Sequence, residues 1–495
     1  MAGKLPGSRR HGAQRRLMDA AALQRQGQLD AAAKLCGQIL KRDQRDFDAI
    51  HLLGVIEGQR HNTKEAAEFL GRAVQIFPGD ATALMNYGNA LFELGRFEDA
   101  LANHDLSLRL NPAGVSAHYN RGVALAALQR PAEALESYAR VVATRPAHAD
   151  AHYGMGNSLA SLLRVDEAIA AFDRAIALQP GRANFHLNKA FACLLAGDLA
   201  GGWPLYEWRW ETAAVAPLWR AFPQPLWRGD TPLAGKTILV HAEQGFGDTL
   251  HFCRYATLVA ERGATVLLEA QPELANLMRT VKGVAKVIPR GDELDAFDLH
   301  CPLLSLPLAF GTTLQSIPAA VPYLHPDPAR AARWRDILGP RARPRVGVVW
   351  SGSGSIELDQ RSLTFERFGD ALPGGVDYVC LQKEVRPSDA PALAARADVR
   401  MIGDKLGDFA DTAALVSLLD VVVSSDTASA HLTGALGKPL WLLLAYDPTW
   451  RWLIGRADSP WYPTAHLFRQ PALGDWATPL QALRDSLSKR FDLAP

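Results

Sequence analysis

The sequence lacks several features that mark common classes of protein. Its five cysteines are scattered, none forms a C-x-x-C pair, and no histidine and cysteine cluster has zinc spacing. No apolar run is long enough to cross a bilayer. The 53 basic and 52 acidic residues nearly cancel, so the charge gives no reason to expect nucleic acid or an anionic membrane as a partner. We therefore expect a cytoplasmic protein with buried, reduced thiols and no structural metal.

The length of 495 residues predicts two or three domains. Residues 1–12 are basic and lack the apolar core of a secretory signal, which indicates a solvated tail. Changes in composition divide the rest into a repetitive region (13–212), an aromatic and proline-rich joint (213–235), and two stretches of alternating strand and helix patterns (236–325 and 326–495).

The repetitive region keeps a period of 34 residues over four copies, the first anchored at Gly54. Each copy has a glycine, an alanine twelve positions later, and a proline twenty-four positions later. Small residues permit close contact between paired helices, and proline stops the second helix. This pattern resembles the tetratricopeptide repeat, a helix–turn–helix unit of the same length. We expect good repeats over 47–182 and degenerate units near 13–46 and 183–212.

Asparagine recurs beside the repeated glycine, and this predicts a binding face. The positions concerned are Asn86, Asn89, Asn120, Asn157 and Asn188. On a concave face, their amides would hold the backbone of an extended peptide without demanding particular side chains. The alternative is that they are ordinary solvated helix residues, and the sequence leaves both interpretations open.

The stretches 201–210 and 222–235 break the repeat and are rich in large aromatic side chains. They include Trp203, Tyr206, Trp208, Trp210 and Trp227. A flexible tether would be polar, so these side chains indicate a packed joint that fixes the repeats against the next domain. Stacking on a ligand is the alternative role.

From residue 236 onward, short β-branched runs alternate with helical stretches, which is typical of parallel sheets covered by helices. We expect strands at 237–241, 265–269, 285–288 and 297–301, and, beyond a proline-rich break, at 345–350, 377–382, 399–402, 420–424 and 440–444. Helices are expected at 248–261 and 272–281. The stretches 236–325 and 326–495 are expected to form two lobes, and a terminal helix near 476–489 is expected to cross back to the first lobe. The whole chain is thus predicted to be α + α/β, with a ligand cleft beyond the carboxyl ends of the strands.

The stretch "GFGDTLHF" after the first of these strands has part of a dinucleotide-binding pattern. Gly245 and Gly247 match its first two glycines, and Glu269 ends the next strand where a ribose-binding acid would stand. Leu250 replaces the third glycine, however, and an ionised Asp248 would repel a pyrophosphate at the helix start. We therefore do not expect an NAD-dependent enzyme.

Asp248 instead suits a general base at a helix start. The helix dipole keeps a carboxylate ionised there, and a carboxylate facing a cleft can take a proton from an attacking hydroxyl. The alternative is that Asp248 is an acidic residue of the first turn that only stabilises the helix. His241 and Glu243 flank the loop and are alternative bases, or groups that orient it.

The stretch "LDVVVSSDTASAHLTGALGKP" in the second half places polar groups where a buried strand meets a helix. Ser425 or Asp426 is expected to cap this helix, which carries His431 one turn further on. Free backbone NH groups, the Thr427 hydroxyl and the helix dipole would together bind phosphate. The alternative for His431 is a satisfied core histidine.

These two motifs resemble those of heptosyltransferases, which are GT-B glycosyltransferases that use a nucleotide-activated sugar. The resemblance covers about 236–490. The order of repeats and lobes resembles bacterial glycosyltransferases that carry tetratricopeptide repeats, including those that modify flagellin, and the O-GlcNAc transferases. This implies a twin Rossmann-like GT-B region, a nucleotide sugar as co-substrate and a protein acceptor, with flagellin as a candidate.

The resemblance also implies roles for individual residues. Asp248 takes the role of the catalytic base. The donor-binding residues would be Gly245, Gly247, Arg361, Gln382, Lys383, Asp426, Thr427 and His431. Arg361 stands where heptosyltransferases keep a lysine near the donor phosphates, and its planar fork suits phosphate oxygens; a surface ion pair with Asp359 is the alternative. Trp450, Trp452 and Trp461 are expected to pack the lobe, unless one of them borders the sugar.

The resulting hypothesis is an inverting, metal-independent glycosyltransferase without a cofactor. It would move a sugar from a nucleotide donor to a hydroxyl of a protein held by the repeats. Cationic side chains and helix dipoles can neutralise a diphosphate leaving group without a metal. The competing hypothesis is a repeat scaffold whose α/β region binds a nucleotide sugar without chemistry, or binds nothing.

Overall fold

The computed structural model describes residues 6–352 and 361–493. The chain divides into two compact units, one ending at Phe185 and the other beginning at His186. No helix within the described ranges is both long and apolar enough to span a membrane.

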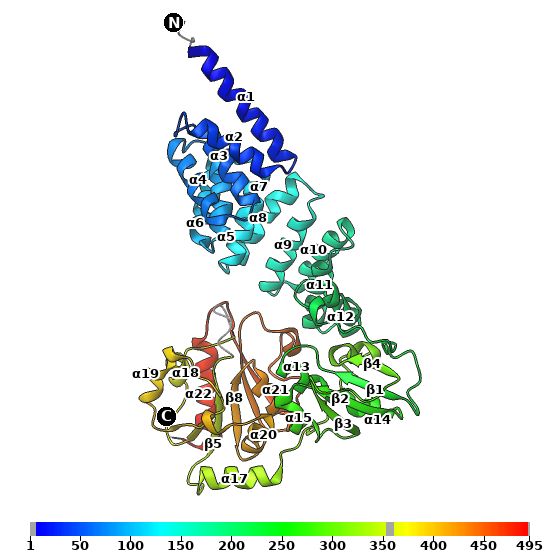
Figure 1. Cartoon of the computed structure of the whole chain (residues 1–495). Coiled ribbons are helices and arrows are strands. Elements are labelled where there is room, and N and C mark those ends of the chain that lie inside the picture. Colours follow the sequence, from blue (N-terminus) through cyan, green and yellow to red (C-terminus); the bar gives the residue numbers. More distant parts are fainter. Residues whose placement is uncertain (1–5, 353–360, 494–495) are drawn as a thin grey trace. The chain divides into compact units, whose positions relative to one another are not determined.

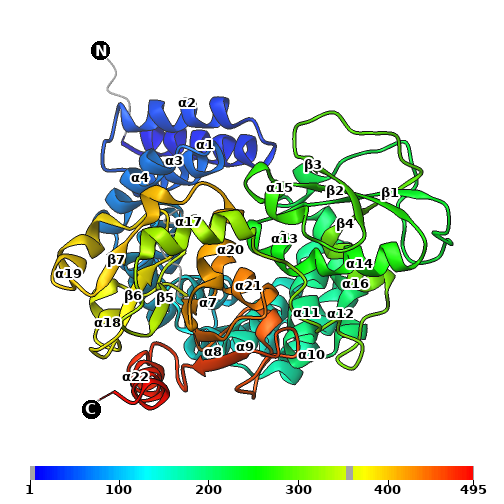
Figure 2. The same ribbon diagram turned by 90° about the horizontal axis from the view of Figure 1, so that it is seen from below.

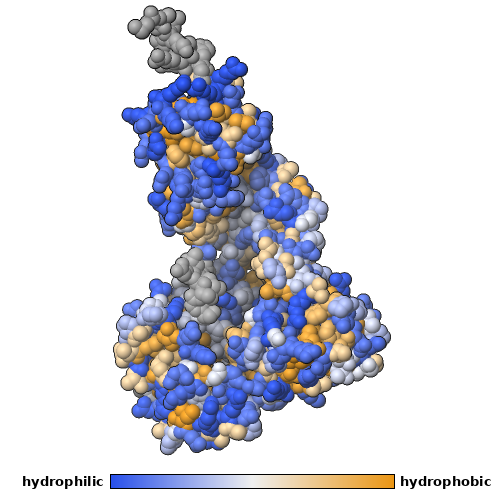
Figure 3. Space-filling view, in the orientation of Figure 1, coloured by the Kyte–Doolittle hydropathy of each residue, from blue (hydrophilic) through white to orange (hydrophobic). Residues whose placement is uncertain are grey.

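The first unit consists of helices that pair in chain order into antiparallel hairpins (Figure 1). They are α1 (Pro6–Arg25), α2 (Leu29–Leu40), α3 (Phe47–Gln59), α4 (Thr63–Ile76), α5 (Ala81–Glu93), α6 (Phe97–Leu110), α7 (Val115–Ala127), α8 (Pro131–Thr144), α9 (Ala149–Ser161) and α10 (Val165–Leu178). Because α1 begins at Pro6, residues 6–12, which the sequence assigned to a solvated tail, belong to a helix. Hydrophilic residues predominate on the visible face of these hairpins (Figure 3).

The repeated glycines and alanines lie where the two helices of each hairpin touch. A Cβ atom added to Gly122 would come within 2.7 Å of the Tyr138 ring, and one added to Gly156 within 2.5 Å of the Phe172 ring. The four repeated alanines are at most 1% exposed (Ala66, Ala100, Ala134 and Ala168). The second helix of each good repeat ends two residues before its proline, as with α4 and Pro78. The requirement for small residues at these contacts is confirmed.

The second unit begins with the end of α11 (Ala183–Ala196) and α12 (Leu199–Tyr206). The sequence grouped both helices with the repeats up to residue 212; in the structure the residues from His186 onward belong to the second unit, where α12 contacts α16. Trp203 of α12 is buried, donates from Nε1 to the carbonyl of Thr312 at 2.9 Å, and meets the Trp450 ring edge-on at 5.4 Å. Trp227 is buried as well, so the aromatic segment is packed rather than a loose tether.

The first lobe is built on a parallel sheet with the strand order β3-β2-β1-β4 (Figure 2). Its elements are β1 (Thr237–His241), α13 (Phe246–Phe252), α14 (Arg254–Glu261), β2 (Thr265–Ala270), α15 (Pro272–Met278), β3 (Val284–Pro289), β4 (Leu299–Pro302) and α16 (Leu306–Ala309). The single helix expected at 248–261 is divided at Cys253 into α13 and α14.

The second lobe has a six-stranded parallel sheet with the order β10-β9-β8-β5-β6-β7. Its elements are α17 (Pro328–Leu338), β5 (Arg345–Val349), α18 (Phe365–Gly369), β6 (Asp377–Cys380), α19 (Ala390–Ala394), β7 (Val399–Met401), α20 (Phe409–Ser417), β8 (Val421–Ser425), α21 (Ala428–Ala435), β9 (Leu440–Leu444), β10 (Ala465–Arg469) and α22 (Ala477–Phe491). This is the order of a doubly wound sheet, whose switch point lies between β5 and β8.

Two expectations about the end of the chain were wrong. Strand β10 was not predicted, because its short sequence "AHLFR" has no β-branched residue. Helix α22 does not cross back to the first lobe. Its Leu483 and Leu487 are fully buried and belong to the core of the second lobe, together with Val346 and Tyr378.

His104 provides a test of the repeat packing. His104 lies against Gly88 in its repeat, just as Phe172 lies against Gly156 in a later repeat. Burial lowers the pKa of His104 to about 4, whereas an unfolded histidine titrates near 6.5. The unfolded chain therefore binds more protons, and stability is lost as the pH falls through 6.5 toward 4, by about 2 kcal/mol at pH 5. We expect His104→Phe to remove this loss.

The measurement is urea unfolding at pH 7 and pH 5, followed by circular dichroism at 222 nm. All twelve tryptophans lie at or after Trp203, so tryptophan fluorescence reports the second unit separately. The partly exposed His118, changed to Gln, is the control and should keep the pH dependence of the wild type. An unchanged pH dependence in the His104→Phe variant would contradict the assignment.

Candidate functional site

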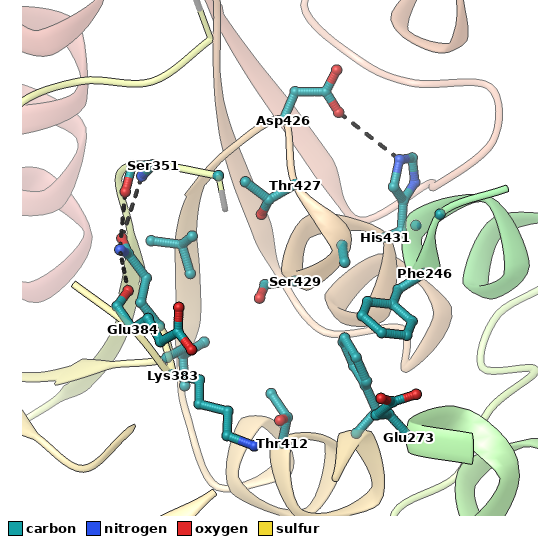
Figure 4. Close-up of a pocket in the computed structure, with 18 of the residues that line it drawn as sticks. Phe246, Glu273, Ser351, Lys383, Glu384, Thr412, Asp426, Thr427, Ser429 and His431 are labelled. Atoms are coloured by element: carbon teal, nitrogen blue, oxygen red, sulfur yellow. Dashed lines mark hydrogen bonds and ion pairs between the residues drawn. The ribbon is translucent and has the colours of Figure 1, made fainter. Parts of the chain in front are cut away.

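A pocket of about 690 Å³ lies between the two lobes of the second unit, at the carboxyl ends of several strands. The first lobe contributes residues 245–248 and Glu273. The second lobe contributes residues that follow β5, β6 and β8, the edge of the sheet where doubly wound folds bind ligands. Figure 4 shows Phe246 on the side of the first lobe, and Asp426, Thr427 and Lys383 on the side of the second. We call this the interlobe pocket.

The two lobes meet where α13 crosses α21. A Cβ atom added to Gly247 would lie 3.0 Å from Cδ2 of His431 and 3.6 Å from Cα of Ala428. A larger side chain at Gly247 would therefore push the helices apart. The second glycine of "GFGD" thus permits the contact between lobes, in addition to lining the interlobe pocket.

Asp248 lies in the first turn of α13 and lines the interlobe pocket. Its Oδ2 accepts a hydrogen bond of 3.1 Å from the backbone NH of Gly245. Its Oδ1 accepts a charge-assisted hydrogen bond from Nη2 of Arg451 in the second lobe. This ion pair with the guanidinium occupies the oxygen that a base would use.

Asp426 and Thr427 occupy the turn between β8 and α21. Oδ2 of Asp426 accepts a hydrogen bond of 2.8 Å from the Thr449 hydroxyl, and Oδ1 faces Nε2 of His431 at 3.9 Å (Figure 4). The expectation that Ser425 or Asp426 caps α21 was wrong. The N-cap residue is Thr427, and its hydroxyl lies 3.1 Å from Oγ of Ser424 instead of capping the helix.

His431 is buried at the base of the interlobe pocket, stacked against Trp452 at 5.3 Å. Burial, assisted by the nearby guanidinium of Arg451, holds its pKa well below the usual value. The imidazole is therefore neutral at pH 7. It can act in the pocket as a hydrogen-bond donor or acceptor but not as a cation.

Three further residues expected at the donor site also line the interlobe pocket: Arg361, Gln382 and Lys383. The carboxamide of Gln382 is bound within the protein, because Oε1 accepts from the backbone NH of Trp350 at 2.8 Å and Nε2 donates to Oγ of Ser351 at 3.0 Å. Gln382 thus shapes the end of β5. The Lys383 side chain is exposed, and Asp359, the alternative partner of Arg361, lies outside the described residues.

The other two candidate bases are absent from the described lining of the interlobe pocket. Nε2 of His241 lies 3.2 Å from Nδ1 of the buried His300, and burial lowers the pKa of His241 to about 3. Glu243 is buried and accepts two hydrogen bonds from Arg209, at 2.8 and 2.9 Å. Both side chains support the loop after β1 and leave Asp248 facing the pocket.

Several asparagines of the repeats form contacts between successive hairpins. Nδ2 of Asn120 donates to Oδ1 of Asn89 at 2.7 Å, and Nδ2 of Asn86 lies 2.9 Å from Nε2 of His51. These four side chains lie on the first helices of their hairpins, which are α3, α5 and α7. Each of these helices contacts the first helix of the next hairpin. Asn157 is half-buried at the corresponding place on α9, whereas Asn188 belongs to the second unit.

Arg451 and Thr449 contact the two aspartates of the interlobe pocket and were not predicted from the sequence. Both lie in "DPTWRWLIG", in which only the tryptophans were assigned a role. The sequence did contain a signal for Arg451, because it stands between two tryptophans that were expected to pack the lobe. A charge at such a position requires a partner, and both tryptophans are buried. Trp450, Trp452 and Trp461 are at most 5% exposed and pack the lobe, as expected. No group of three His, Cys, Asp or Glu side chains in the described ranges is arranged to hold a metal ion.

Comparison with known proteins identifies the repeats. Tetratricopeptide repeat families match residues 59–102, 125–183 and 153–206, and a TPR repeat family matches 88–129. The N-terminal part of the chain therefore contains tetratricopeptide repeats. "Protein FlbA" of Caulobacter vibrioides is 28% identical over 332 residues, which are 60% of this chain and 54% of that protein. The chain thus spans about half the length of this relative.

Solved structures resemble the chain over about a third of its length. YrrB, described as a TPR protein with an unusual peptide-binding site, is 25% identical, with a TM-score of 0.32 over 34% of this chain and 88% of its own. PilF of Pseudomonas aeruginosa is 18% identical, with a TM-score of 0.37 over 42% of this chain and 94% of its own.

The pair of Arg209 and Glu243 provides a test of the structural role given to Glu243. Arg209→Met leaves a buried carboxylate without its partner, and we expect the second unit to lose about 3–5 kcal/mol of unfolding free energy. The double variant Arg209→Met/Glu243→Leu should recover most of this loss, because it removes both charges. Tryptophan fluorescence during urea unfolding measures both changes. Additive losses in the double variant would contradict a structural pair.

Proposed function

We propose that the chain is a glycosyltransferase that moves a sugar from a nucleoside diphosphate donor to a hydroxyl group of a protein acceptor. The observation that carries the proposal is that Asp248 of one lobe and Asp426, Thr427 and His431 of the other line a single pocket. Two Rossmann-like lobes around such a pocket are the arrangement of GT-B enzymes, to which the sequence motifs point. The volume of about 690 Å³ is in the range of small-molecule sites.

In the proposed reaction, the acceptor oxygen attacks the anomeric carbon of the sugar. The bond from that carbon to the diphosphate breaks, and the nucleoside diphosphate leaves with the electron pair. The acceptor proton passes to Asp248. Attack opposite the leaving group inverts the anomeric centre.

Three cationic side chains line the interlobe pocket and are proposed to contact the leaving diphosphate: Arg361, Lys383 and Arg451. Positioned cations stabilise developing negative charge without a metal. Arg451 has two roles in this proposal. It pairs with Asp248 in this structure, and it turns to the diphosphate when the donor binds, which frees the carboxylate for the acceptor.

The ion pair between Asp248 and Arg451 also favours a second candidate function. A pocket in which Arg451 stays on Asp248 would bind a nucleotide sugar without transferring it. The chain would then be a tetratricopeptide scaffold with a ligand-binding domain.

Asp248→Asn distinguishes the two functions. The amide keeps an acceptor for Arg451 but cannot take a proton, so we expect turnover to fall by a factor of about 10² or more. The dissociation constant for the nucleoside diphosphate should stay within about threefold of the wild type. Glu273→Gln removes an exposed carboxylate from the same pocket and should retain turnover. Transfer of a radiolabelled sugar is measured beside calorimetric binding; loss of both functions in Asp248→Asn would contradict the role as base.

The acceptor is proposed to bind the asparagine face of the repeats. Replacing Asn86, Asn89 and Asn120 by Ala should raise the KM for a protein acceptor by about tenfold or more and leave nucleotide affinity unchanged. Flagellin is the first acceptor to test. The control is Asn103→Ala on the second helix of its hairpin, where the side chain donates a hydrogen bond to the carbonyl of Asp99 one turn earlier. An unchanged KM in the triple variant would exclude this face.

A further inference from the structure

Tyr462 joins two buried histidines that come from different lobes. Its hydroxyl lies 2.9 Å from Nδ1 of His251 in α13 and 3.0 Å from Nδ1 of His431 in α21. Nε2 of His431 in turn faces Oδ1 of Asp426 at 3.9 Å. Histidines 251 and 431 and Tyr462 are all at most 5% exposed. A chain of four polar groups therefore runs from the first lobe to the interlobe pocket.

Hydrogen counting restricts the protonation of this chain. A tyrosine hydroxyl donates one hydrogen and accepts through two lone pairs, so Tyr462 donates to at most one of the two histidines and accepts from at least one. Since both histidines use Nδ1, at least one imidazole carries its proton on Nδ1.

Two further observations fix the tautomer of each histidine. Nε2 of His251 is buried without a hydrogen-bond partner, and an unpaired lone pair is tolerated better than an unpaired N–H. At the other end, a lone pair on Nε2 of His431 would face the Asp426 carboxylate and be repelled by it. Both observations favour a proton on Nδ1 of His251 and on Nε2 of His431.

The surroundings hold the hydroxyl in place. A Cβ atom added to Gly434 would approach the Tyr462 ring to 2.4 Å, so the ring packs closely on α21. The guanidinium of Arg254 lies 4.7 Å from the ring centroid, and Arg254 donates to the carbonyl of Trp461 at 2.8 Å. Tyr323 also contacts the Tyr462 hydroxyl, and its own hydroxyl hydrogen is donated to the carbonyl of Leu250 at 2.9 Å.

We infer that Tyr462 and His251 are positioning residues that hold His431 as a neutral Nε2–H donor, aimed at Asp426 and the interlobe pocket. His251 donates to Tyr462, and Tyr462 donates to His431. The N–H of His431 then orients the Asp426 carboxylate and is available to a ligand oxygen. Because His251 belongs to the first lobe, this arrangement is complete only when the lobes are closed. The functional part of this inference rests on the proposed donor site.

The tautomers themselves can be measured without any ligand. Protein labelled with ¹⁵N at histidine is examined by long-range ¹H–¹⁵N correlation, and the signals of His251 and His431 are assigned by their loss in single variants. We expect a protonated Nδ1 for His251 and a protonated Nε2 for His431. The same tautomer in both, or the reverse assignment, would overturn the inference.

Tyr462→Phe tests the consequence for binding. The variant removes only the hydroxyl, and we expect about threefold to tenfold weaker binding of the nucleoside diphosphate that the wild type binds most tightly among UDP, GDP, ADP and CDP. Tyr378→Phe is the matched control, because this buried tyrosine of the same lobe bonds only the carbonyl of Pro373. It should lose comparable stability and keep its affinity. Equal affinity in both variants would overturn the inference.

The direction of the hydrogen bonds predicts an asymmetry at position 251. His251→Asn places an amide N–H near the former Nδ1–H and should restore most of the affinity, whereas His251→Leu should behave like Tyr462→Phe. Equal effects of Asn and Leu would indicate simple packing and overturn the inference. If the wild type binds none of the four nucleotides, the proposed function fails, while the tautomers still decide the hydrogen-bond arrangement.

Discussion

The close crossing of α13 and α21 is the contact on which the rest of the site depends. Gly247 allows the two helices to approach until its Cα faces the ring of His431. This approach brings Asp248 within reach of Arg451 and His251 within reach of Tyr462. A single glycine thus determines whether side chains more than 200 positions apart in the sequence share one pocket.

The polar groups of the pocket form two separate systems. One is charged and consists of Asp248 and Arg451, which neutralise each other in the absence of ligand. The other is neutral and consists of His251, Tyr462 and His431, whose burial keeps both imidazoles uncharged. A bound anion would compete for Arg451 in the first system and accept a hydrogen bond from the second. This separation would allow a pocket with several carboxylates to bind the proposed diphosphate.

Features that depend on local sequence were predictable. The spacing of Gly, Ala and Pro predicted the helical hairpins, because every repeat needs small residues where its two helices touch. Runs of β-branched residues predicted nine of the ten strands in the described ranges. Asp248 and Asp426 each follow a strand of a parallel sheet, and both line the interlobe pocket. The partners Arg451 and Tyr462 were not predictable, because such long-range pairs leave no period in the sequence. Gln382 lines the interlobe pocket as expected, but its hydrogen bonds to Trp350 and Ser351 were not predictable for the same reason, since these partners follow another strand.

The most direct test of the central claim is a crystal structure of the chain with a bound nucleoside diphosphate. The account predicts a diphosphate in the interlobe pocket near Thr427, with Arg451 turned from Asp248 to the phosphate oxygens and Asp248 open to solvent. A nucleotide bound elsewhere would contradict the account. So would a nucleotide in the interlobe pocket that leaves Arg451 on Asp248.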